Sequence, residues 1–167
     1  IRLGHKRRGR AELVAAKKAR VADILGPDAC MLDDLNDRFD DAYWIAEPED
    51  IIALNVPHYH EAKLNENRLA INARYYPARG ATLVTVIGDD HPGLFYRIAG
   101  AIHLAGANII DARIHTTRVG KAIDNFLVQD PLGQPFQEDS QLERLETSIR
   151  DALANKIELV PQLAKRP

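Results

Sequence analysis

Apolar residues in the first sixty positions recur at intervals typical of helices. Residues 13–25 place apolar side chains on one face of a helix, which Gly26-Pro27 would end because proline cannot continue a helix. Residues 32–39 repeat apolar side chains at spacings of three and four and predict a second, short helix. A third helix is predicted over residues 47–57, ending at a proline. The pattern therefore predicts a helical region over residues 1–62.

The pattern then changes to the alternation of a strand. Over residues 69–76 every second side chain is apolar, which predicts a β-strand. Residues 77–80 have the composition of a turn, and residues 81–87 are rich in strand-forming side chains. These segments predict a β-hairpin, with residues 63–80 leading into the main part of a sheet.

Beyond the hairpin the pattern predicts a helix, two strands and a last helix. Residues 94–105 are apolar on one helical face, strands are predicted over 109–117 and 122–129, and the last helix over 138–154. From residue 81 the order is β-α-β-β-α, which is most of a ferredoxin-like βαββαβ unit. The fourth strand of that unit is either absent or replaced by residues 69–76.

The predicted fold class is α+β, with a helical N-terminal segment followed by a ferredoxin-like domain over residues 81–155. Residues 156–167 form a charged, proline-bounded tail that we interpret as a linker. The core is expected where inward-facing strand positions meet the apolar faces of the two helices. The residues assigned to this core are Val84, Val86, Leu94, Ile98, Ile102, Ile110, Ile114, Phe126, Val128, Leu145 and Ile149.

Composition and charge narrow the classes of function. The chain has 22 Lys and Arg against 24 Asp and Glu, so it lacks the basic surplus of most nucleic-acid-binding proteins. Its apolar runs are far shorter than the roughly 20 residues of a membrane-spanning helix. The lone Cys30 cannot form an internal disulfide, so the cytoplasm is the expected compartment. Because the chain begins at Ile1 and its only methionine is Met31, we expect it to be a piece of a longer polypeptide.

No motif for catalysis stands out along the chain. Glycine-rich phosphate-binding motifs and the Gly-x-Ser-x-Gly nucleophile elbow are absent. Cys30 lies in an apolar and acidic stretch, which favours a structural thiol over a nucleophile. His58 and His60 form a His-x-His pair, but without a nearby cysteine or carboxylate cluster they predict a polar loop before the hairpin. We therefore expect no catalytic residue, metal site or resident cofactor in this chain.

The junction between the strand at residue 87 and the following helix is the most informative place for binding. Asp90, Pro92 and Gly93 are typical of a helix start, where an acid can cap free N–H groups and proline presets the backbone. The same free N–H groups could instead receive a small anion such as an amino-acid carboxylate. The residues alone favour the ordinary helix start and leave the binding role open.

Longer motifs around this junction resemble a known family of domains. The turn Asp90–Leu94, followed by Leu104–Ile109 into the second strand, resembles an ACT domain. The runs Asp90–Ala101, Gly106–Ile114 and Val128–Phe136 are similar to the first of the tandem ACT domains in bifunctional PII uridylyltransferase/uridylyl-removing enzymes. The resemblance implies a βαββαβ regulatory module that pairs with another unit and binds an amino acid at their interface.

The resemblance also implies a function for the parent protein. In that family a nucleotidyltransferase domain attaches UMP to the PII nitrogen-signalling protein, an HD phosphohydrolase domain removes it, and the ACT pair senses glutamine. The chain lacks a Gly-Ser nucleotidyltransferase signature and a His-Asp dipeptide, so both catalytic centres, with their UTP and Mg²⁺, are expected outside it. Residues 1–62 would be the end of the HD portion or a connector. Expected partners are glutamine, the PII protein, and a second ACT domain or a homodimer partner paired through the sheets.

Two other functions stay open at this point. The chain could be an ACT-type pairing module that holds no ligand, or the ACT regulatory domain of an amino-acid biosynthetic enzyme. Calorimetry with glutamine would separate the sensing module from the ligand-free one.

The residues that the resemblance assigns to ligand binding lie in two segments. They are Asp89, Asp90, His91, Gly93 and Leu94 in the turn, with Asn108 and Ile109 at the start of the second strand. Backbone N–H groups near Gly93 and Leu94 would hold the ligand carboxylate, and the Asn108 side chain or neighbouring carbonyls would take its ammonium or amide group. Arg113 and His115 alternate with apolar residues, so they would face either a partner or solvent.

Overall fold

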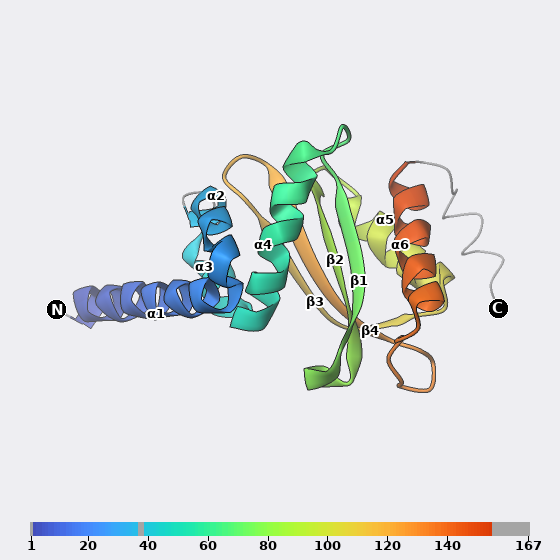
Figure 1. Cartoon of the computed structure of the whole chain (residues 1–167), viewed down its shortest axis with the longest axis horizontal. Coiled ribbons are helices and arrows are strands. Elements are labelled where there is room, and N and C mark those ends of the chain that lie inside the picture. Colours follow the sequence, from blue (N-terminus) through green and yellow to red (C-terminus); the bar gives the residue numbers. More distant parts are fainter. Residues whose placement is uncertain (1, 37–38, 155–167) are drawn as a thin grey trace.

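The computed structural model describes residues 2–36 and 39–154 (Figure 1). Its central feature is an antiparallel four-stranded sheet, with the helical N-terminal region on one face and two helices on the other. The predicted linker over residues 156–167 lies outside the described residues. Within the described residues no helix is long and apolar enough to cross a membrane.

The N-terminal region is helical, as predicted. Its elements are α1 (Arg2–Leu25), a 3₁₀ segment (Gly26–Leu32), α2 (Asp33–Asn36), α3 (Asp41–Ala46) and α4 (Glu49–Leu64). The short helix predicted over residues 32–39 is present as α2 (Asp33–Asn36), and the 3₁₀ segment before it runs to Leu32. Part of that prediction, residues 37–38, falls outside the described residues.

Helix α4 runs further than the sequence predicted. It continues through Pro57 to Leu64, so the expected helix end at Pro57 and the expected polar loop at His58 and His60 are both wrong. Proline inside a helix removes one backbone hydrogen bond and strains the preceding turn. Here the burial of side chains on both sides of it, including Val56 and Tyr59, compensates for that loss.

The sheet completes a ferredoxin-like unit with a strand that comes before it in the sequence. The strands are β1 (Ala70–Tyr76), β2 (Ala81–Asp89), β3 (Asn108–Thr116) and β4 (Lys121–Gln129). All neighbours pair antiparallel in the order β1-β2-β4-β3, and a 3₁₀ turn (Pro77–Arg79) joins the β1–β2 hairpin. The fold class is confirmed, and β1 replaces the missing fourth strand beside β2.

Helices α5 (Leu94–Leu104) and α6 (Asp139–Leu153) cover one face of this sheet, while α4 and the rest of the helical region cover the other (Figure 1). Val84 and Phe126 belong to the core beneath α5 and α6. Ile87 and Ile123 point to the opposite face and pack with Trp44 and the helical region. The sheet is therefore buried on both sides, with a separate core on each.

Most of the predicted core is buried, but two of its residues are not. Ile110 and Ile114 on β3 are 43% and 44% exposed. Strand β3 is an edge strand, and its register with β4 shifts between Ile109 and Asp111. Ile114 pairs with Asp124 on the α5–α6 face, but the side chain stays open to solvent at the sheet edge. The assignment of these two isoleucines to the core is wrong because the sequence pattern does not show which strand lies at an edge.

Candidate functional site

The turn between β2 and α5 has a left-handed backbone. Gly93 precedes the helix with φ 85° and ψ −2°, a conformation that glycine adopts without strain. The Leu94 amide already donates to the His91 carbonyl at 3.2 Å, whereas the Gly93 amide makes no hydrogen bond within the described residues. The expected helix cap by Asp90 is wrong, because its carboxylate accepts a hydrogen bond from the Thr116 hydroxyl (3.4 Å) instead.

A pocket of about 340 Å³ opens beside this turn. Asp89, His91 and Leu94 line it from the turn, and Arg150 lines it from the last turns of α6. The remaining lining residues are Asn67, Leu69, Gly88, Leu153 and Ala154. The structure thus places three residues of the predicted turn in the wall of one pocket.

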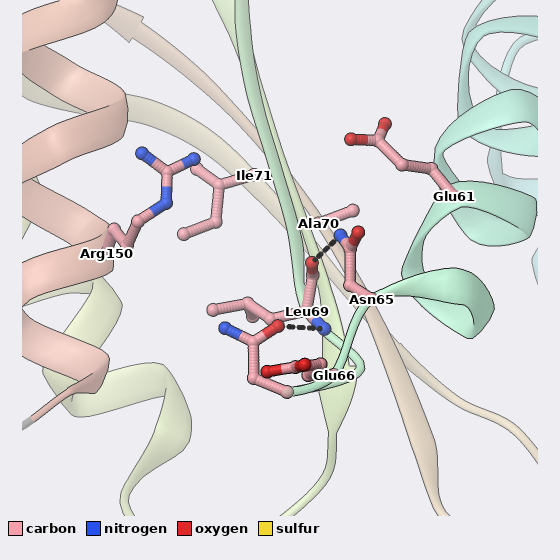
Figure 2. Close-up of a pocket in the computed structure, with 8 residues that line it drawn as sticks. Glu61, Asn65, Glu66, Leu69, Ala70, Ile71 and Arg150 are labelled. Carbon is pink, nitrogen blue, oxygen red and sulfur yellow. Dashed lines mark hydrogen bonds between the residues drawn. The ribbon is translucent and has the colours of Figure 1, made fainter.

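A second pocket of about 410 Å³ adjoins the first and shares Asn67, Leu69 and Arg150 with it. Figure 2 shows Arg150 reaching in from α6 on one side of β1 and Glu61 from α4 on the other. The Asn65 side-chain amide donates to the Leu69 carbonyl at 2.8 Å, and the Leu69 amide donates to Asn67 at 3.2 Å. These bonds fix the conformation of the turn between α4 and β1.

The charges in these pockets suit a zwitterionic ligand. The planar Arg150 guanidinium can bind a carboxylate through two parallel hydrogen bonds. The Asp89 carboxylate already accepts a hydrogen bond from Lys121 at 3.1 Å, and its remaining lone pairs can accept from an ammonium group. Arg150 was missed in the sequence because it lies on the polar side of an amphipathic helix and belongs to no motif. Arg150 comes close to the β2–α5 turn only because α6 packs on the sheet beside β1.

Asn108 and Ile109 lie at the other end of the sheet. Asn108 pairs with Gln129 at one end of β4, while Asp89 pairs with Lys121 at the opposite end. Eight residues of strand separate these positions, or about 26 Å at the usual rise per residue. Within one chain the two predicted segments therefore cannot contact the same amino acid.

Arg113 and His115 face neither a partner nor open solvent. Both bind the fully buried Glu47 between α3 and α4, Arg113 at 3.1 Å and His115 at 2.8 Å. Arg113 also pairs with Asp111 at 2.9 Å, and the Tyr43 ring packs edge-on against His115. This cluster fastens the helical region to the edge strand β3. The sequence interpretation missed this cluster because it assigned Glu47 to the start of a helix.

Asp124 is a buried acid close to Asp90 of the β2–α5 turn. It lies on the α5–α6 face of β4, 1% exposed, and its Oδ1 atom has no hydrogen-bond partner among the described residues. Burial, with a smaller contribution from the Asp90 carboxylate, raises the pKa of the Asp124 carboxyl to about 7, against an opposing effect of His115. No group of three potential metal ligands occurs within residues 2–36 and 39–154.

The fold defines a ferredoxin-like unit joined to a helical region, with two adjoining pockets beside the β2–α5 turn. Along all 167 residues the chain is 63% identical to a bifunctional uridylyltransferase/uridylyl-removing enzyme of Novosphingobium aromaticivorans and 59% identical to one of Erythrobacter litoralis. An enzyme of the same name from Zymomonas mobilis is 37% identical over 156 residues. The chain is therefore homologous over its whole length to one segment of these enzymes, which confirms the resemblance found in its motifs.

The matched segment is a small part of those relatives. The chain spans 18% of the Novosphingobium and Erythrobacter enzymes and 17% of the Zymomonas enzyme. No protein-family model matches the chain, and no solved structure matches it significantly.

Proposed function

We propose that this chain is the regulatory, glutamine-sensing ACT portion of a cytoplasmic enzyme that uridylylates and deuridylylates the PII nitrogen-signalling protein. Its homology to a segment of bifunctional uridylyltransferase/uridylyl-removing enzymes supports this parent and weighs against a biosynthetic enzyme. UTP, Mg²⁺ and the PII protein would bind elsewhere in the parent.

The observation that carries the sensing role is the pocket at the β2–α5 turn. It combines the Arg150 guanidinium with the Asp89 carboxylate. The Gly93 amide of the same turn makes no hydrogen bond to the part of the chain that the structure describes. Glutamine has a carboxylate and an ammonium group that match these charges. Its side-chain amide would be held by the asparagines of the α4–β1 turn or by a second unit.

Pairing through β3 would unite the two predicted halves of the site. Strand β3 has one free edge, and Thr116 at its end contacts Asp90 of the turn. If the β3 edges of two units pair antiparallel, the start of β3 in one unit lies opposite the end of β3 in the other. Asn108 and Ile109 of one unit then approach the Asp89–Leu94 turn of its partner. We propose a second ACT unit, in the parent enzyme or in a second copy, as this partner.

Glutamine titration calorimetry tests the sensing role. We expect saturable heat with the 167-residue chain, and an affinity at least about ten-fold lower for Arg150→Gln, because a charged hydrogen-bonding group is lost. Arg79→Gln removes another exposed arginine, next to the far end of β2, and serves as the matched control.

The same variants are then measured in the intact parent enzyme, where a second unit can complete the site. There we expect Arg150→Gln and Gly93→Val to weaken the response of uridylyl removal to glutamine. A parent enzyme whose response is unchanged in both variants would contradict a site at this turn. Absence of glutamine heat together with an intact β3 association would instead favour the ligand-free pairing module.

A further inference from the structure

A third cavity, of about 270 Å³, lies between α4 and the sheet on the face away from α5. Basic side chains from three separate segments line it: Lys63 of α4, Arg68 of the α4–β1 turn and Lys121 of β4. Tyr59, Asp89 and Val119 complete the wall. Three cations against one carboxylate make this cavity electropositive, although the whole chain is slightly acidic.

Two polar side chains in this wall are almost completely buried. Tyr59 is 0% exposed, and its hydroxyl has no hydrogen-bond partner among the described residues. A buried tyrosine hydroxyl normally finds a partner, so one without a partner among the described residues has a donor to offer a ligand. Lys121 is 7% exposed, and its ammonium group pairs with the exposed carboxylate of Asp89 at 3.1 Å, the one partner found for it among residues 2–36 and 39–154. An ammonium group has three donors, so Lys121 keeps donors for a further acceptor.

Arg68 enters the cavity wall from an unusual backbone conformation. It has a φ of 53°, and among the described residues no other residue except glycine has a positive φ. The Arg68 amide donates to the Asn65 carbonyl at 3.0 Å, which holds the residue in this turn. The turn therefore holds the Arg68 backbone in a conformation that directs its side chain differently from a helical or extended backbone.

We infer that this cavity binds a small oxyanion, a phosphate or a short dicarboxylate, between Arg68, Lys121 and the Tyr59 hydroxyl. Arginine and lysine supply charge-assisted donors to the anion oxygens. The Tyr59 hydroxyl, which has no partner among the described residues, donates a hydrogen bond to the anion. This site is distinct from the amino-acid pocket, although Asp89 borders both. Because α4 and the sheet both contribute, a bound anion would stabilise the contact between the helical region and the ferredoxin-like unit.

Thermal unfolding and NMR titration of the 167-residue chain test this site with inorganic phosphate and, separately, with malonate. Sodium chloride at equal ionic strength is the reference for both. We expect one of the two anions to raise the unfolding temperature in a saturable way and to shift the amide signals of Tyr59, Arg68 and Lys121. The anion that does so identifies the source of the oxyanion.

Two variants and one control make the test specific. Tyr59→Phe removes only an unpartnered hydroxyl, so the protein should fold normally while its anion affinity falls about ten-fold. Arg68→Gln should reduce the affinity by at least as much, whereas Arg79→Gln should leave it unchanged. If neither anion shifts these signals, or if all three variants weaken binding equally, the cavity is not an oxyanion site. If Arg68→Gln fails to fold, the anion affinity of Tyr59→Phe alone tests the site.

Discussion

Asp124 is a carboxyl group that the native structure holds in an unfavourable place. Its side chain is buried on the α5–α6 face of the sheet, and one of its oxygens has no partner among the described residues. Moving an ionised carboxylate from water into such a site costs free energy unless charges or hydrogen bonds compensate. The raised pKa of about 7 expresses this cost, because the native state holds the Asp124 proton more tightly than the unfolded chain does.

The stability of the protein should therefore depend on Asp124 in a defined pH window. Between the unfolded pKa of 3.8 and the native pKa of about 7, the unfolded chain releases this proton while the native state keeps it. The contribution of Asp124 to the free energy of unfolding thus falls as pH rises through this window. Asp124→Asn removes the titration, so urea unfolding should find the variant more stable than the natural chain by up to about 4 kcal/mol at pH 8.

The comparison at pH 4 is the control for that measurement. There the natural chain carries a neutral Asp124, so the two proteins should differ much less in their free energies of unfolding. A variant that is less stable than the natural chain at pH 8 would show that ionised Asp124 is satisfied by its surroundings.

At the scale of elements, the joint between the helical region and β3 rests on one buried acid. Glu47 lies between α3 and α4 and binds Arg113 and His115, which are more than sixty residues away in sequence. Removing one partner of a buried ion pair leaves an uncompensated charge and is strongly destabilising. Glu47→Gln should therefore lower the free energy of unfolding in urea by about 3 kcal/mol.

An exposed ion pair between the same two regions provides the matched control. Arg118 binds Asp40 at 3.2 Å, with 69% and 63% of the two side chains exposed. Such surface pairs contribute little, so Arg118→Gln should change the free energy of unfolding by less than about 0.5 kcal/mol. Equal losses in the two variants would mean that burial of Glu47 has no special importance for this joint.

The sequence predicted the elements whose signal is local. The helix that ends near Leu104 and the strand over residues 70–76 follow from apolar spacing and turn residues, and so does the turn around Gly93. Features that depend on distant partners could not be predicted in this way. The continuation of α4 through Pro57 depends on packing against other elements, and the pocket position of Arg150 depends on how α6 docks.

The same limit applies to the exposed edge of the sheet. Ile110 and Ile114 have the alternation of core residues, and only the strand order shows that β3 has one neighbour. The ligand-binding residues proposed from the resemblance also fall into two groups, which only the strand pairing shows to be far apart. Three residues of the turn, Asp89, His91 and Leu94, line one pocket. Asn108 and Ile109 lie at the other end of the sheet.

At the scale of the whole molecule, the layers give β3 two different contacts. One face of this strand is fastened to the helical region through Glu47, while its outer edge and the neighbouring apolar side chains remain open. These exposed apolar residues are Phe95, Tyr96, Ile110 and Ile114. A unit that pairs along β3 would therefore contact a strand that is also bound to the helical region through Glu47. Under the proposed function, glutamine would influence the parent enzyme only through a difference in affinity between paired arrangements.

Pairing along β3 makes a direct prediction for the isolated chain. The chain should self-associate in sedimentation equilibrium, with Ile114 of one copy close to Ile110 of the other in the antiparallel arrangement. Ile114→Lys places an ammonium group in that contact, where it is partly desolvated without a partner, so the dimer dissociation constant should rise at least about ten-fold. Tyr75→Lys alters a similarly exposed side chain, 40% against 44%, on the opposite edge strand β1 and should leave association unchanged. If Tyr75→Lys disrupts the dimer and Ile114→Lys does not, the units pair through β1, and the start of β3 cannot complete the site at the β2–α5 turn.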